Sequence, residues 1–150
     1  MITQKQITEF LACKNLAIAG ASRDKKKFGN QVMHELIGKG FEVFSVNPNA
    51  EEIDGMKVYP DLLSLPEAVE SLLIVTPKAE TKSMLEQALQ KGIKHIWIQQ
   101  MADSPEALEF AKENQMDVIH GICILMHAGP VKGGHAFHRF IMKLFGKLPK

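Results

Sequence analysis

The 150-residue sequence lacks the features of several special classes of protein. It has only two cysteines, Cys13 and Cys123, which are too few for a disulfide-stapled fold and are typical of a reducing, cytoplasmic compartment. No apolar run approaches the roughly 20 residues of a membrane span, and the polar first residues do not resemble a signal peptide. The net charge of +1 gives the whole molecule no reason to bind nucleic acid or an anionic membrane, so any anion site must be local.

Short apolar runs alternate along the chain with amphipathic segments. This alternation predicts an α/β fold, namely a Rossmann-like, doubly wound, mostly parallel five-stranded sheet with helices on both faces. The length suits one domain over residues 1–150, with 126–150 as a C-terminal extension. The predicted strands are 15–19, 41–46, 71–75, 95–98 and 117–120, and the predicted helices are 3–12, 31–39, 79–91 and 104–114.

Between the second and third predicted strands the chain is polar. Residues 49–58 are expected to form a loop with a turn at Asp54-Gly55, and residues 61–65 a single helical turn.

The turn after the first predicted strand has the features of a phosphate site. The small residues Ala19, Gly20 and Ala21 would let phosphates approach the backbone, and Gly20 can adopt a positive φ. The next helix would direct its N–H groups and positive dipole end toward an anion. A parallel sheet with such a turn typically binds a nucleotide there, which favours function over a merely solvated loop. The cations in the same loop are Arg23, Lys25, Lys26 and Lys27.

No carboxylate stands at the predicted carboxyl ends of the strands, where ligands bind in such sheets. An NAD site usually has Asp or Glu after the second strand, but Asn47 stands here. The full Gly-x-Gly-x-x-Gly is also absent, because Ala21 and Ser22 follow Gly20, and there is no P-loop motif. A ribose phosphate would be repelled by a carboxylate and attracted by the basic loop, and NADP and CoA both carry one.

A set of short motifs follows one another in a fixed order. The motifs are Ile18-Ala-Gly20-Ala-Ser22, Val46-Asn47-Pro48, Ile53-Asp-Gly55, Val58-Tyr59-Pro60, Leu65-Pro66, Ile74-Val75-Thr76-Pro77, residues 88–97 with Gln99, and Val118-Ile119 before Cys123. Together they resemble the CoA-binding domain family, the Rossmann-like module also found in the α subunit of succinyl-CoA synthetase and in ADP-forming acyl-CoA synthetases. The resemblance covers about residues 10–123.

The resemblance implies a ligand, CoA or acyl-CoA, and a set of residues that hold it. It does not imply ligase activity, because the chain has no room for the second domain whose histidine the synthetases phosphorylate. Gly121 and Ile122 also depart from the Asn or Arg that the family often has before the cysteine matched by Cys123. The implied contacts are the CoA phosphates at Gly20, Ala21 and Ser22 with Arg23, Lys25, Lys26 or Lys27; the adenosine at Asn47 and Pro48; the adenine and pantetheine path along Val75, Thr76 and Pro77, flanked by Ile98 and Gln99; and the thiol end at Cys123.

The C-terminal extension predicts an amphipathic helix at 135–148. We expect it to dock on the domain, or on a second copy of the chain in a homodimer, rather than on a membrane surface. The residues of its apolar side are Phe137, Phe140, Ile141, Leu144 and Phe145.

Late histidines and Cys123 could supply metal ligands, but glycines and a proline separate them and no second cysteine joins them. We therefore expect no metal, with polar or capping roles for His120, His127, His135 and His138. Cys123 is expected to be a buried, inert thiol and Trp97 a core residue.

Three functions remain open. The first is a small cytoplasmic CoA- or acyl-CoA-binding protein without catalysis, favoured because no acid–base pair or activated nucleophile is visible at the strand ends. The second is an NADP-dependent reductase, for which 150 residues leave little room for a substrate domain. The third is a nucleotide-binding scaffold for protein interaction.

Overall fold

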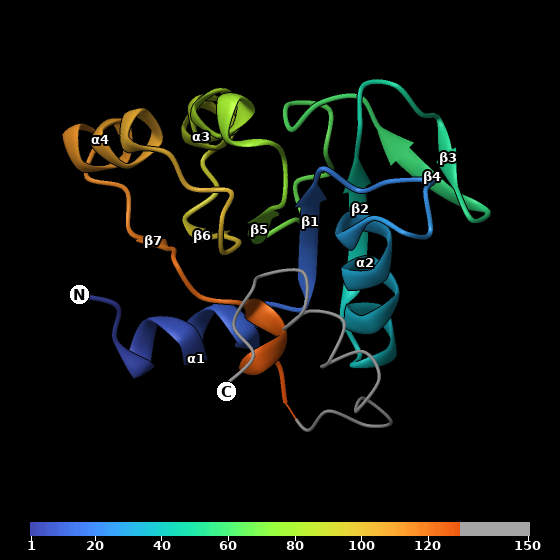
Figure 1. Cartoon of the computed structure of the whole chain (residues 1–150), viewed down its shortest axis with the longest axis horizontal. Coiled ribbons are helices and arrows are strands. Elements are labelled where there is room, and N and C mark those ends of the chain that lie inside the picture. The colour runs from blue at the N-terminus through green and yellow to red at the C-terminus, as the bar shows by residue number, and fades with distance from the viewer. Residues whose placement is uncertain (130–150) are drawn as a thin grey trace, which may run out of the picture.

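A seven-stranded sheet in the order β3-β4-β2-β1-β5-β6-β7 organises residues 1–129, the part of the chain that the computed structural model describes (Figure 1). All neighbouring strands are parallel except β3 and β4. The elements are α1 (Gln4–Ala12), β1 (Asn15–Ala19), α2 (Phe28–Gly38), β2 (Glu42–Val46), β3 (Glu52–Ile53), β4 (Met56–Tyr59), β5 (Ser71–Ile74), α3 (Lys78–Lys91), β6 (His95–Ile98), α4 (Pro105–Glu113), β7 (Val118–Ile119) and the short 3-10 helix η1 (Ile124–Met126).

Each face of the sheet carries its own apolar core. Residues of α1, α2 and η1 pack on one face and those of α3 and α4 on the other, and Figure 1 shows α3 and α4 across the sheet from α1 and η1. Strand β1 alternates between the two cores, because Ile18 enters the first and Ala17 the second. This arrangement confirms the predicted Rossmann-like α/β class with helices on both faces.

Trp97 lies in the first core, as expected. It is fully buried, and its ring lies 5.3 Å from that of Phe10 in an edge-on arrangement. Its indole N–H donates to the Ile122 carbonyl at 3.1 Å, so burial leaves no unpaired donor.

The predicted helix ends are largely confirmed, because they rest on local capping chemistry. Thr3 caps α1 in a capping box with Gln6, and Ser104 caps α4 with Pro105 in its first turn. Gly92 ends α3 with φ +82°. Helix α2 begins at Phe28, earlier than the predicted start at residue 31.

The prediction of five strands is wrong, because β3 and β4 form a hairpin inside the expected loop 49–58. The predicted turn at Asp54-Gly55 is confirmed, and both residues have positive φ, as a two-residue hairpin requires. Strand β4 then pairs parallel with β2. Strands of two and four residues are too short for their alternation to stand out in the sequence.

The helical turn expected at 61–65 is also wrong. The segment forms turns instead, in which the Ser64 N–H donates to the Asp61 carboxylate at 2.8 Å and the Leu65 N–H to the Leu62 carbonyl at 3.2 Å. The predicted C-terminal helix, 135–148, lies outside the described residues. Within residues 1–129, no helix combines the length and the apolar character that crossing a membrane would require.

Candidate ligand-binding site

The strand order reverses between β1 and β5. From β1 the chain moves outward to β2 and β4, and it then returns to the other side of β1 with β5. Ala19 is level with Val46 of β2 and with Ile74 of β5, so the loops after these strands start at one edge of the sheet. Such a reversal at the carboxyl ends is where open parallel sheets bind ligands.

Two glycines let the backbone close tightly at this point. Gly20 has φ +97°, and a Cβ there would lie 2.8 Å from the Thr76 backbone nitrogen. A Cβ on Gly29, in the first turn of α2, would overlap the Gly20 carbonyl oxygen. Gly29 was not among the predicted site residues. It takes the helix-packing role of the last glycine in a dinucleotide-binding turn. The motif places that glycine five residues after the first, whereas Gly29 follows Gly20 by nine, so the sequence analysis did not recognise it.

The loop between Gly20 and α2 is held by its own hydrogen bonds. The Ser22 hydroxyl accepts from the Asp24 N–H at 3.1 Å, and the Asp24 carboxylate accepts from the Lys26 N–H at 2.9 Å. No side chain caps the start of α2 at Lys27. The predicted cationic side chains of this loop are exposed beside the turn, namely Arg23, Lys25, Lys26 and Lys27.

Asn47 braces the turn from the end of β2. Its amide donates to the Ala21 carbonyl at 2.8 Å, and its oxygen accepts from the Asn49 N–H at 2.8 Å. Both ends of the side chain are therefore engaged within the protein, and the exposed Pro48 follows at the rim. The predicted contact of these residues with adenosine stays a prediction.

Within residues 1–129, two polar groups at the adjacent ends of β5 and β6 are buried without a hydrogen-bond partner. They are the Thr76 hydroxyl and the Gln99 amide nitrogen, in residues that are 7% and 2% exposed. The Gln99 oxygen accepts from the Ile124 N–H at 3.1 Å, which fixes the direction of the amide. Buried polar groups normally have partners, so these two groups suit a ligand with complementary atoms. Half-buried Val75 and exposed Pro77 flank Thr76.

The two remaining predicted residues lie deeper. The Ile98 side chain is fully buried in the core under α3 and α4, so only its backbone is at the strand end. Cys123 is 5% exposed in the opposite core, so its predicted burial is confirmed, while its inertness stays a prediction. Within residues 1–129, no three His, Cys, Asp or Glu side chains converge as metal ligands would.

A polar network ties the β3–β4 hairpin to the glycine turn. The Asn30 amide of α2 donates to the Ser22 carbonyl at 2.8 Å and to the Asp54 carboxylate at 2.9 Å, and His34 Nε2 lies 2.7 Å from the same carboxylate. The hydrogen bonds from His34 and then Asn30 hold the pKa of the Asp54 carboxyl below its usual value. The sequence analysis found the Asp54 turn but missed this link, because the bonds to Asp54 come from residues 20 and 24 positions away.

Known proteins share this architecture. The CoA binding domain family matches residues 14–128. The α subunit of ADP-forming acetate–CoA ligase II from Pyrococcus furiosus is 30% identical over 77% of this chain, which spans only 28% of that subunit. The uncharacterized protein YneT of Bacillus subtilis is 24% identical over 81% of this chain and 91% of its own length.

Solved structures of known proteins have a similar fold. A hypothetical protein from Pyrococcus horikoshii has a TM-score of 0.78 and 32% identity, with 84% of this chain and 89% of that chain covered. The match to the family covers more than half of the sequence and includes both sides of the strand-order reversal. The chain therefore belongs to the CoA-binding domain family.

Proposed function

We propose that this protein binds CoA or an acyl-CoA at the carboxyl ends of β1, β5 and β6 and carries out no chemistry of its own. The observation that carries the proposal is the pair of unpartnered polar groups, the Thr76 hydroxyl and the Gln99 amide, beside the glycine turn. The pantetheine arm of CoA has amide N–H and C=O groups that could satisfy both. Without a ligand, burial removes each group from water, and no hydrogen bond within the described protein replaces the one to water.

The charges near the turn support the phosphate end of this ligand. Exposed cationic side chains follow the turn, and the start of α2 adds its dipole. The neutral Asn47 at the end of β2 leaves room for a ribose phosphate where NAD-binding proteins usually place a carboxylate. These features would also suit NADP, so the test must separate the two ligands.

The absence of chemistry is part of the proposal. Among the described residues directly after the strands, the nearest approach to an acid–base pair is His120 and Asp103, whose Nδ1 and Oδ2 atoms are 3.7 Å apart, beyond hydrogen-bond distance. The closer pair, His34 and Asp54 at 2.7 Å, belongs to the network that ties the hairpin to α2. The Cys123 thiol is buried in the core, so it is not exposed to attack a substrate as a nucleophile.

The experiment is calorimetric titration of the whole chain with CoA, dephospho-CoA, NADP and NAD. We expect micromolar binding of CoA that weakens with salt, and weaker binding of dephospho-CoA, because it lacks the ribose phosphate. The Lys25→Ala/Lys26→Ala/Lys27→Ala variant should lose most of the affinity. The control is Lys57→Ala/Lys94→Ala/Lys112→Ala, which removes the same charge from exposed positions elsewhere.

Binding of NADP but not CoA would replace this proposal with the reductase. No binding heat with any of the four compounds would leave the scaffold for protein interaction as the remaining function. Equal losses in the two triple variants would show that net charge, rather than the loop, governs affinity.

A further inference from the structure

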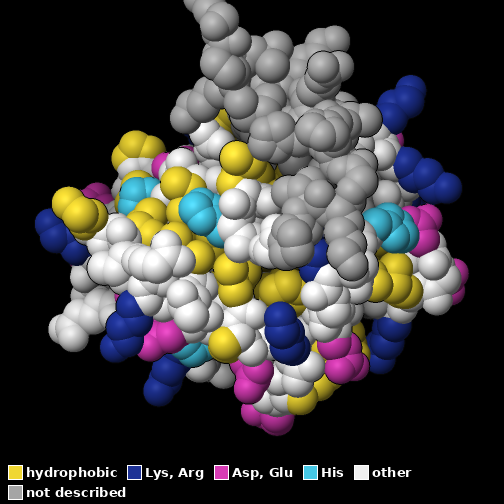
Figure 2. All heavy atoms as spheres, turned by 90° about the horizontal axis from the view of Figure 1, so that it is seen from below, with side chains coloured by type: hydrophobic (Ala, Val, Ile, Leu, Met, Phe, Trp, Pro, Cys, Tyr) yellow, Lys and Arg dark blue, Asp and Glu magenta, His cyan; other side chains and the backbone are white. Residues whose placement is uncertain are grey.

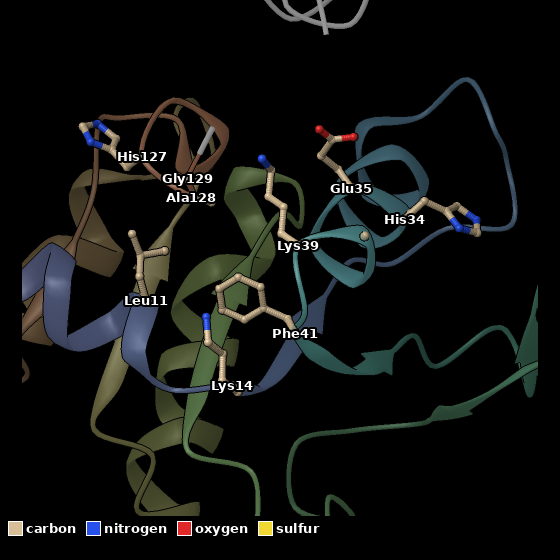
Figure 3. A pocket seen from close by; sticks show the side chains of 10 residues that line it. Leu11, Lys14, His34, Glu35, Lys39, Phe41, His127, Ala128 and Gly129 are labelled. Carbon is tan, nitrogen blue, oxygen red and sulfur yellow. The ribbon is translucent and has the colours of Figure 1, made fainter. Parts of the chain in front are cut away.

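A cavity lies at the other end of the sheet, away from the candidate ligand site. Its volume is about 630 Å³. Lys14 directly precedes β1 and Phe41 directly precedes β2, so the cavity opens at the amino ends of these strands. Leu11 of α1, Phe41 and Gly129 stand around one hollow (Figure 3). This cavity has no part in the proposed CoA site.

Apolar side chains make up part of the wall of this cavity, beside charged ones such as Lys14, Glu35 and Lys39. Leu11 is half-buried, Phe41 is 6% exposed, and the Lys14 ammonium lies 4.4 Å from the centre of the Phe41 ring. Yellow hydrophobic side chains gather over the middle of the face that includes this region (Figure 2). Ile37, which directly precedes the lining residue Gly38 on α2, is an exposed large apolar side chain. An apolar hollow on a surface marks a contact with another chain segment or ligand.

The chain itself continues from the wall of this cavity. Gly129 lines the cavity and is the last described residue, so the 21 residues 130–150 start there. The family match ends at residue 128, so this segment lies outside the matched CoA-binding domain.

The composition of residues 130–150 complements that of the rest of the chain. The segment contains five of the 18 lysines and arginines and none of the 17 acidic residues. The remainder is therefore acidic overall and attracts the segment, but the cavity wall itself holds one carboxylate, Glu35, beside two lysines, Lys14 and Lys39. The apolar side of the segment, rather than its charge, therefore has to favour the cavity. The apolar residues of the segment recur at helical spacing, so one side of it can enter the hollow while its cations stay in water. These apolar residues are Phe137, Phe140, Ile141, Leu144 and Phe145.

We propose that residues 130–150 of the same chain dock in this cavity and cover Leu11 and Phe41 with their apolar side. A direct covalent connection at Gly129 gives the segment a high effective concentration at the cavity, which favours it over the same segment of a second copy. Through Glu35 and Gly38 in the cavity wall, the docked segment would rest on the C-terminal half of α2, the helix whose first turn packs on Gly20.

The test is a double-mutant cycle on the full chain. Leu11→Ser removes an apolar group from the cavity, and Phe140→Ser/Ile141→Ser removes two from the segment. Docking predicts that the combined variant loses less stability than the two separate changes together, by about threefold or more in the unfolding constant. The control for the cavity is Leu108→Ser, a half-buried leucine on α4 across the sheet, and that for the segment is Arg139→Gln/Lys143→Gln. Both controls should be additive.

Hydrogen exchange supplies a readout that does not depend on additivity. Phe140→Ser/Ile141→Ser should speed exchange of amides around Leu11 and Phe41 about tenfold or more, and should leave β5 and β6 unchanged. Additive losses with unchanged exchange would overturn the proposal. Coupling that grows with protein concentration, with a dimer in sedimentation, would overturn it in favour of a second copy. Loss of binding to anionic phospholipid vesicles, without any change in exchange, would overturn it in favour of a membrane-surface segment.

Discussion

The two ends of the sheet differ in what they leave unsatisfied. At the carboxyl ends, backbone meets backbone at Gly20, and the unpartnered groups are polar, the Thr76 hydroxyl and the Gln99 amide. At the amino ends, the hollow is lined by the apolar side chains of Leu11 and Phe41 together with charged side chains such as Lys14 and Glu35. Buried polar groups without partners suit a ligand with hydrogen-bonding groups, whereas exposed apolar side chains suit contact with a chain segment. We therefore propose that one fold provides two sites for different kinds of partner.

The largest effect should come from closing the carboxyl end. Gly29→Ala places a methyl group against the Gly20 carbonyl, so we expect a loss of about 2–4 kcal/mol in the free energy of unfolding and loss of CoA binding. Urea denaturation and calorimetry would measure both. Gly38→Ala, at the other end of α2, meets no atom within 4 Å and should be neutral or stabilising by roughly 0.4–1 kcal/mol. Similar losses in both variants would remove the distinction between the two ends of this helix.

A subtler change probes the unpartnered hydroxyl. Thr76→Val keeps the shape of the side chain and removes the polar atom. Without ligand it should raise the free energy of unfolding by about 1 kcal/mol, because no buried hydroxyl is left unpaired. It should also weaken CoA binding about tenfold, since one hydrogen bond to the ligand is lost.

Thermal unfolding with and without CoA separates these two effects. The control is Thr8→Val, at an exposed position on α1. A Thr76→Val protein that is less stable without ligand would mean that the hydroxyl already has a partner, and the argument for a buried polar group without a partner would fail.

The hydrogen bonds from Asn30 and His34 to Asp54 of the hairpin should make the free energy of unfolding depend on pH. Because the pKa of the Asp54 carboxyl is lowered in the folded protein, its carboxylate stabilises the fold above the usual carboxyl value of about 4. That contribution is lost as the pH falls through the lowered pKa. The difference in stability between wild type and Asp54→Asn should therefore be constant near neutral pH and shrink in acid.

Urea midpoints between pH 2 and 7 would measure this difference, with the exposed Glu113→Gln as control. A difference that grows in acid would contradict the assignment of Asp54 as the anionic partner of His34 and Asn30.

The smallest effect should come from a charge at the amino end. Lys14→Met keeps the aliphatic stem and removes the ammonium over Phe41, which should cost less than about 1 kcal/mol in the free energy of unfolding. CoA affinity should not change, because Lys14 lies at the opposite end of β1 from Gly20. Any loss of CoA affinity in this variant would show that the two ends are coupled.

Local patterns predicted much of the candidate site. The turn at Gly20 and the polar residues Thr76 and Gln99 stand directly after apolar runs, so their place at the strand ends could be read from the chain. Gly29 and Asn30 could not, because their roles depend on α2 lying against the turn and on a hairpin more than 20 residues away. The hairpin itself was missed because its strands have only two and four residues.

The sequence by itself determined the α/β class, the neutral strand ends and the basic loop, because alternation, turn chemistry and charge act between near neighbours. Only the tertiary structure decided that the strand order reverses at β1 and β5, that the Thr76 hydroxyl and the Gln99 amide are buried without partners, and that a hollow opens beside Gly129. These properties arise where distant segments meet, and whether a group is paired or left vacant there depends on how closely those segments pack.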